Sequence, residues 1–126
     1  MQRNTGGYKK KMGALGEKIA GEYLINTDGY NIVARNYTCP LGELDIVAYD
    51  GETLVFVEVR TGSTSSVGYA EESIGFRKQK KLRQLAAYYL KDKGMSDCSC
   101  RFDVVIILFE KGRSRAEEIK LLKNAF

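Results

Sequence analysis

Three acidic residues lie in the two most apolar segments of the chain. Glu43 and Asp45 belong to the run GELDIVAYD, and Glu58 belongs to the run TLVFVEVR that follows it. Like charges that crowd beside apolar side chains are destabilising unless protons, a cation or an arginine compensates them. Carboxylate oxygens are the ligands that Mg²⁺ prefers, together with water and substrate phosphate. Such an ion, or Mn²⁺, can activate water and neutralise charge that develops on a phosphodiester.

The segments that carry these acids are predicted to form the two strands of a hairpin, at about 43–49 and 53–60. Because side chains alternate along a strand, the loop length decides which acids share a face. A two-residue Asp-Gly turn or a four-residue loop places Asp45, Glu58 and Arg60 on one face, and the longer loop sets Asp45 directly opposite Glu58. A three-residue loop would reverse the relative faces.

A salt-bridge network explains the same acids without any ion. Arg60, Arg35 and several lysines are available to pair with them on a solvated face of the sheet. Ion-pair networks cluster acidic residues as metal sites do. On residue spacing alone, the two interpretations are equally well supported.

The remaining segments predict a mixed α/β fold. Apolar residues at helical spacing predict a helix from about Gly13 to Thr27, and a strand follows at Tyr30 to Tyr37. A second helix is predicted at about Ile74 to Lys93 and an apolar strand at Cys100 to Phe109, and the residues after 115 fit either an edge strand or a terminal helix. The order α-β-β-β-α-β implies a central mixed sheet that contains a hairpin and is flanked by helices.

Length and composition indicate one domain. The 126 residues are 44% hydrophobic and 29% charged, as in ordinary globular proteins. Residues 1–12 are predicted to be a flexible basic segment and 13–126 a single domain, in which Thr61 to Ser73 forms a surface loop. No apolar run approaches a membrane span, and the N-terminus lacks the apolar region of a signal peptide, so we expect a cytoplasmic location and no membrane contact.

The residue types exclude several kinds of chemistry. The chain has no histidine, which excludes Ser-His-Asp and Cys-His catalysis and imidazole metal ligands. Cys39, Cys98 and Cys100 lack the usual zinc-binding spacing and are interpreted as reduced structural thiols. The net charge of +4 modestly favours polyanionic partners.

These motifs together resemble the YraN-like proteins, an endonuclease-like family. The resemblance rests on GALGE at 13–17, GELD at 42–45, VEVR at 57–60 and the lysine-bearing second helix, and it extends from about Gly13 to the C-terminus. That family is similar to a branch of the PD-(D/E)XK nuclease superfamily that is close in fold to archaeal Holliday junction resolvases. The resemblance implies a restriction-endonuclease-like core and metal-dependent hydrolysis of phosphodiesters.

The resemblance also implies roles for individual residues. Asp45 corresponds to the first metal-binding acid of the superfamily, Glu58 to the acid of its E-x-K element, and Glu17 to the acid on the first helix of resolvase-like members. These three residues would coordinate Mg²⁺ or Mn²⁺, with Glu43 as a secondary candidate. Arg60 occupies the position of the superfamily's lysine, and because arginine stays protonated it supplies only charge and hydrogen bonds there.

Basic residues predict contacts with phosphates. Lys78 falls inside the apolar stripe of the second helix, from which it can reach the carboxylates or a phosphate, or pack its stem on the sheet while its amine reaches water. The exposed helix face and the N-terminal run would add salt-dependent, sequence-independent affinity for a nucleic-acid backbone, unless these lysines and arginines form only a solvated surface. They are Arg77, Lys80, Lys81, Lys9, Lys10 and Lys11.

The sequence and the resemblance therefore predict a metal-dependent nuclease-like protein that acts on or binds nucleic acid, DNA in preference to RNA, with branched or structured DNA among its substrates. A homodimer is expected because resolvase relatives act on two strands. One alternative is a DNA-binding module without turnover, which Arg60 favours. The other is a protein interaction module whose acids form only ion pairs. Asp103, in the last apolar strand, is assigned no catalytic role and is expected to pair with Arg101 or another cation.

Overall fold

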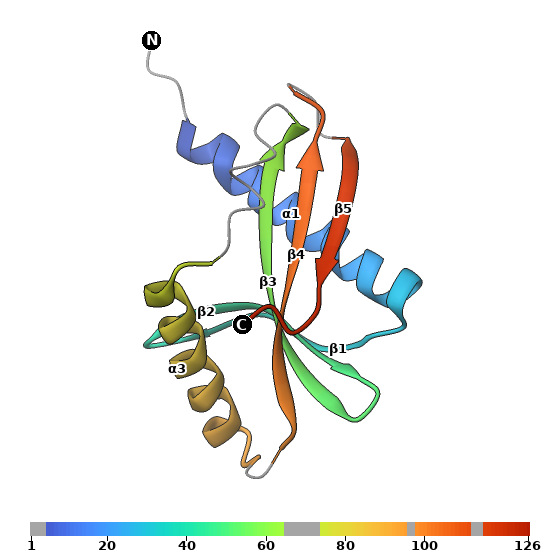
Figure 1. Ribbon diagram of the computed structural model, residues 1–126. Coiled ribbons are helices and arrows are strands. Elements are labelled where there is room, and N and C mark those ends of the chain that lie inside the picture. The colour runs from blue at the N-terminus through green and yellow to red at the C-terminus, as the bar shows by residue number, and fades with distance from the viewer. Residues whose placement is uncertain (1–4, 65–73, 96–97, 112–114) are drawn as a thin grey trace.

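The computed structural model describes residues 5–64, 74–95, 98–111 and 115–126, except for the side chains of residues 5–9. Five strands form one sheet in the order β1-β2-β3-β4-β5 (Figure 1). β3 and β4 are parallel and all other neighbours are antiparallel, so the predicted mixed α/β fold is confirmed. The elements are α1 (Thr5–Asp28), β1 (Asn31–Cys39), β2 (Gly42–Asp50), β3 (Thr53–Ser63), α3 (Phe76–Asp92), β4 (Cys100–Phe109) and β5 (Ala116–Leu122).

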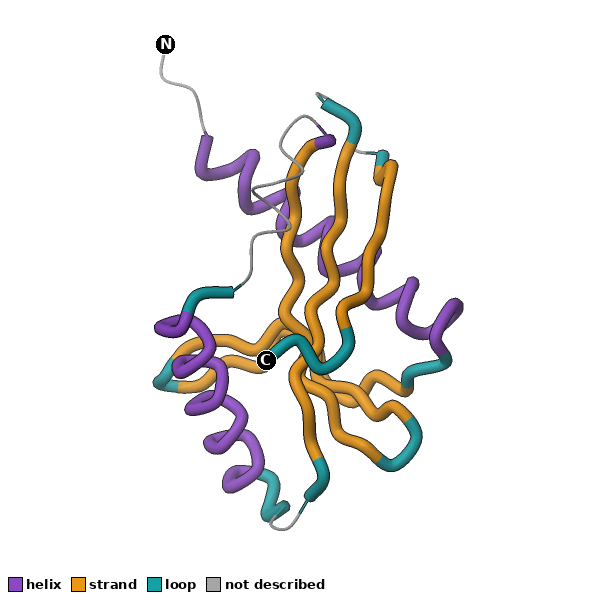
Figure 2. Tube along the Cα trace, in the orientation of Figure 1, coloured by secondary structure: helices purple, strands orange, loops and turns teal. Residues whose placement is uncertain are grey.

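Within the described residues, α1 and α3 cover opposite faces of the sheet. Figure 2 shows α1 behind β3, β4 and β5 and α3 in front of β2. On β3, the alternation of a strand turns Val55 toward the core cluster that contains Leu24 of α1, and turns Phe56 toward the cluster that contains Leu85 and Tyr89 of α3. Residues 54–57 of β3 are buried on both faces, and this part of the strand is continuously apolar.

The helix boundaries differ from the predicted ones. α1 begins at Thr5, eight residues before the predicted Gly13, so residues 5–12, which were predicted to be flexible, are helical. The lysines in that segment are good helix formers, and no proline separates them from the rest of α1. α3 is shorter than predicted at both ends. Within the described residues, neither helix is long and apolar enough to cross a membrane.

The structure resolves the open question at the C-terminus. Residues 116–122 form the edge strand β5, which pairs antiparallel with β4, and no terminal helix forms there. Ile119 and Leu121 pack against the α1-side core, which explains the alternation in this segment. β3 continues to Ser63, into the segment that was predicted to be a loop from Thr61 to Ser73. Residues 65–73 of that predicted loop lie outside the described part of the chain.

The hairpin turn differs by one residue from the Asp-Gly turn that the sequence predicts. Asp50 pairs with Thr53, so the two turn residues are Gly51 and Glu52. The regular register ends at the pair Ile46 and Val57. Extending it by one position sets Asp45 opposite Glu58, the pairing expected for the four-residue loop.

Asp103 is the buried charged residue of the described chain, with no exposed surface. Its carboxylate accepts hydrogen bonds from the Tyr30 hydroxyl at 2.7 Å, from Arg101 Nε at 2.9 Å and from the backbone N–H of Asn124 at 2.9 Å. Arg101 also donates to Asp50 at 2.6 Å. The predicted pairing of Asp103 with Arg101 is therefore confirmed, and the network ties β4 to the start of β1 and to the chain after β5.

Candidate metal centre

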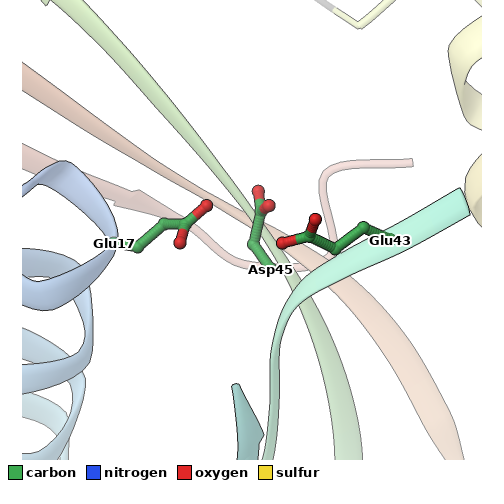
Figure 3. Close-up of side chains that lie close together, drawn as sticks. All are labelled: Glu17, Glu43 and Asp45. Carbon is green, nitrogen blue, oxygen red and sulfur yellow. The ribbon is translucent and has the colours of Figure 1, made fainter. Parts of the chain in front are cut away.

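Three carboxylates converge beside the sheet, one from α1 and two from the first half of β2 (Figure 3). Glu17, Glu43 and Asp45 each offer an oxygen, and these oxygens lie within 4.8 Å of one another. Oxygen ligands about 2.1 Å from one octahedral Mg²⁺ are separated by roughly 3 to 4 Å, so the cluster has the scale of a single ion site. A pocket of about 180 Å³ lies here, and its lining includes Glu17, Asp45, Lys18 and Arg35.

Asp45 occupies the point where β2 separates from β3. Its Oδ2 atom accepts the backbone N–H of Val59 at 2.9 Å, in place of a backbone carbonyl from β2. Leu44 and Ile46 are two residues apart and should share a face, yet Leu44 packs in the α3-side core and Ile46 in the α1-side core. The strand therefore rotates at Asp45, and this rotation brings Glu43 and Asp45 together toward α1.

Two glycines allow the elements of the site to approach one another. A Cβ atom at Gly16 would overlap the Cγ2 methyl of Thr61 on β3, so α1 packs this closely only because position 16 has no side chain. Glu17 follows directly, and the close packing fixes its distance from the sheet. Gly42 adopts φ +143°, a conformation that residues with a Cβ rarely adopt, and it begins β2 immediately before Glu43.

Asn36 of β1 connects two of the acids and was not predicted from the sequence. In the amide orientation that turns its nitrogen toward the carboxylates, Asn36 donates to Glu43 Oε1 at 2.8 Å and to Glu17 Oε2 at 2.6 Å. Each carboxylate keeps a second oxygen for an ion. Asn36 adopts φ +52°, which asparagine tolerates better than most residues. The available signal was an asparagine in the middle of a strand, where this residue type is depleted.

Glu58, which we predicted as a ligand, lies beside the three converging acids and outside their 4.8 Å group. Its Oε1 atom is 3.6 Å from Lys78 Nζ, and its side chain is only 16% exposed. Lys78 thus reaches the carboxylates from α3, as its position in the apolar stripe predicted. Arg60 follows Glu58 by two residues on the same face of β3, and its charge opposes the burial that raises the pKa of Glu58.

The other predicted phosphate contacts lie on exposed surface. Arg77, Lys80 and Lys81 are exposed on α3, and Lys10 and Lys11 are exposed on α1. The side chain of Lys9 is outside the described part of the chain. These positions leave the basic side chains accessible to a polyanion.

Comparison with known proteins places this chain in a family. Residues 16–107, which include the three converging acids and Glu58, match the model of the Uncharacterised protein family UPF0102. The chain belongs to the UPF0102 family. A UPF0102 protein of Moorella thermoacetica is 46% identical over 118 residues, which cover 94% of this chain and 97% of the relative. A UPF0102 protein of Desulforamulus reducens is 49% identical over 119 residues, which cover 93% and 96%. This is the YraN-like family that the motifs resemble.

Burial raises the pKa values of three acids in this UPF0102 protein, Glu17, Asp45 and Glu58, and neighbouring negative charge adds to the shift of Glu17 and Glu58. Burial, followed by the charge of Asp45 and a hydrogen bond with it, raises the pKa of Glu17 to about 7. Burial and then the charge of Asp45 raise the pKa of Glu58 to about 7, against the opposing charges of Lys78 and Arg60. Burial also raises the pKa of Asp45, although the Val59 N–H opposes it. Near neutral pH, the site therefore retains protons that a cation can displace.

Without divalent ions, we expect the unfolding free energy of the UPF0102 protein to fall as pH rises from about 4.5 to about 7. Glu17 and Glu58 have an ordinary pKa of 4.5 and a folded-state pKa of about 7, so the folded protein binds more protons in this window. Their stabilising contribution is complete below 4.5 and is lost as pH passes 7. Urea unfolding at a series of pH values measures this slope. Asp45→Asn should make the fall of unfolding free energy with pH less steep. An equally steep fall in that variant would show that the charge of Asp45 does not contribute to the raised pKa values of Glu17 and Glu58.

Proposed function

We propose that this UPF0102 protein is a metal-dependent, nuclease-like phosphodiesterase that acts on nucleic acid with Mg²⁺ or Mn²⁺. The observation that carries the proposal is the convergence of carboxylate oxygens from Glu17, Glu43 and Asp45 within 4.8 Å. This donor set contains only oxygen, as hard divalent ions prefer. The raised pKa values support it, because a cation would offset the burial that now favours protonation of Glu17 and Asp45 and the repulsion that adds to it at Glu17. The resemblance to PD-(D/E)XK nucleases points to the same chemistry.

The residues around the site would have different roles in the proposed reaction. Glu17, Glu43 and Asp45 would hold the ion, which when bound would polarise water and offset charge on the phosphodiester. Asp45 is fixed for this task by the Val59 N–H. Lys78 and Arg60 place positive charge beside Glu58, where it can stabilise a phosphate oxygen. Glu58, with a pKa of about 7, is suited to hold or release a proton near neutral pH.

Cleavage assays test the proposal. The purified protein is incubated with end-labelled single-stranded, linear duplex and branched DNA, and with matched RNA, in the presence and absence of Mn²⁺. We expect cleavage that requires Mn²⁺. From the resemblance, we propose DNA as the preferred substrate and a homodimer as the acting form. Binding without cleavage would favour the non-catalytic DNA-binding module, and failure to bind any nucleic acid at low salt would favour the protein interaction module.

Asn36→Gly is expected to weaken Mn²⁺ binding about 10- to 100-fold, the usual effect of removing a hydrogen-bond partner of metal ligands. The amide holds Glu17 and Glu43 at their present separation, whereas glycine keeps φ +52° accessible and removes only the side chain. Calorimetric titration with Mn²⁺ measures the change.

Asn124→Gly is the matched control for this experiment. Asn124 also adopts φ +52°, but its backbone N–H binds Asp103, away from the three acids. Its replacement should leave Mn²⁺ affinity unchanged. Wild-type affinity in Asn36→Gly would show that the amide does not position the carboxylates.

A further inference from the structure

Phe76 is the most exposed large hydrophobic side chain in the described part of the chain. It is 82% exposed, whereas Ile25 and Val33, the next in order, are each 45% exposed. Single exposed apolar residues are common and need no explanation by themselves. Phe76 differs from the other exposed apolar residues because basic side chains lie close to it on α3.

Positive charge surrounds Phe76 on the first turns of α3. Arg77, Lys80 and Lys81 are exposed, and Lys80 lies four residues after Phe76 on the same face of the helix. The first turn contains no acid, and Gly75 provides no side-chain cap, so the N-terminal backbone N–H groups and the helix dipole add to the attraction for an anion. An aromatic ring among cations is complementary to a nucleic-acid strand, because the cations attract phosphates and the ring stacks on a base.

The same turn of α3 borders the candidate metal centre. Lys78 follows Phe76 by two residues, which is a rise of about 3 Å along the helix axis and a rotation of about 200° around it, so the two side chains leave α3 on different sides. The ammonium group of Lys78 lies 3.6 Å from the carboxylate of Glu58. A strand with a phosphate at the acids would therefore reach Phe76 by passing around the N-terminal end of α3.

We propose that Phe76 stacks on an unpaired base of the nucleic acid bound at this site. The substrate class would then be single-stranded nucleic acid, or a duplex with an unpaired base at an end, gap or branch, because bases inside a duplex already stack on their neighbours. The proposal rests on the proposed function for the position of the phosphate. The stacking contact itself does not require cleavage.

A tryptophan reporter tests the contact directly. The chain contains no tryptophan, so Phe76→Trp carries a single indole. We expect single-stranded DNA to quench its fluorescence and a strand of abasic sites of equal length to leave it unquenched. Tyr88→Trp is the matched control, since Tyr88 is 38% exposed on the same helix, about 18 Å further along its axis. Absence of quenching at position 76 while the DNA binds, or equal quenching at both positions, would overturn the proposal.

Affinity provides the second measurement. Phe76→Ala should bind single-stranded DNA about 5- to 150-fold more weakly, as expected for the loss of one stacked base, and should bind blunt duplex as the wild type does. Phe76→Tyr should retain the wild-type affinity. Normal binding by Phe76→Ala with Mn²⁺-dependent cleavage intact would refute stacking and leave the proposed function standing. If DNA quenches Phe76→Trp but the wild type does not cleave, stacking would stand and the proposed function would be refuted. A wild-type protein that binds no nucleic acid would refute both.

Discussion

Asp45→Asn is expected to lower Mn²⁺-dependent cleavage at least about 10³-fold while the protein still binds nucleic acid. A divalent ion contributes several kcal/mol of charge stabilisation in the transition state, and each 1.4 kcal/mol or so corresponds to a factor of ten in rate. Asp45 lies between Glu17 and Glu43 (Figure 3), and, after burial, its charge is the largest cause of the raised pKa of both Glu17 and Glu58. Rates with a labelled branched or single-stranded DNA, measured across Mn²⁺ concentrations, determine the loss.

Asp45→Asn is expected to remove activity without unfolding the protein. An asparagine side-chain oxygen can still accept the Val59 N–H, so the contact between β2 and β3 is kept. Removing one of several crowded charges should leave the ion-free protein at least as stable at pH 7. Glu22→Gln, at an exposed position five residues after Glu17 on α1, is the control and should cleave at the wild-type rate. Equal cleavage by Asp45→Asn and the wild type would eliminate the metal-site proposal.

Asp103→Ala is expected to reduce the unfolding free energy by about 3 to 5 kcal/mol, the cost of breaking a buried ion pair by removing one partner. The Tyr30 hydroxyl and the Asn124 N–H would lose their acceptor, and Arg101 would keep its bonds to the Tyr30 hydroxyl and to the more exposed Asp50. A buried donor without a partner is more costly than the bond itself is favourable. Urea unfolding followed by circular dichroism measures the difference.

Asp50→Ala is the comparison variant for Asp103. It removes the other carboxylate that binds Arg101, but the side chain of Asp50 is 29% exposed and water can replace the contact. We expect a loss of about 1 kcal/mol or less. Losses of similar size in the two variants would show that burial of Asp103 is not the source of its contribution.

The sequence by itself determined the two predicted helices, the hairpin strands and the strand at Cys100 to Phe109, but it did not determine whether residues 116–122 form a strand or a helix. The apolar run from Cys100 to Phe109 is long and is followed by charged residues, so the bounds of β4 agree with the prediction. Alternation along the hairpin strands predicted Asp45 and Glu58 on one face, and they directly follow the last observed pair of the hairpin, Ile46 and Val57. Helical spacing predicted that Lys78 could reach the carboxylates, and it lies 3.6 Å from Glu58. These features depend on local periodicity, which a sequence contains directly.

Only the tertiary structure decided which acids meet. Glu43, not Glu58, lies within 4.8 Å of Glu17 and Asp45. The reason is that β2 rotates at Asp45, so that the residue before it packs in the α3-side core and the residue after it in the α1-side core. Asn36 of β1 contacts two of the acids, and its backbone adopts a left-handed conformation. The distance of Glu17 from β2 depends on how closely α1 packs at Gly16. These determinants are contacts between segments distant in sequence, and periodicity within one segment does not specify them.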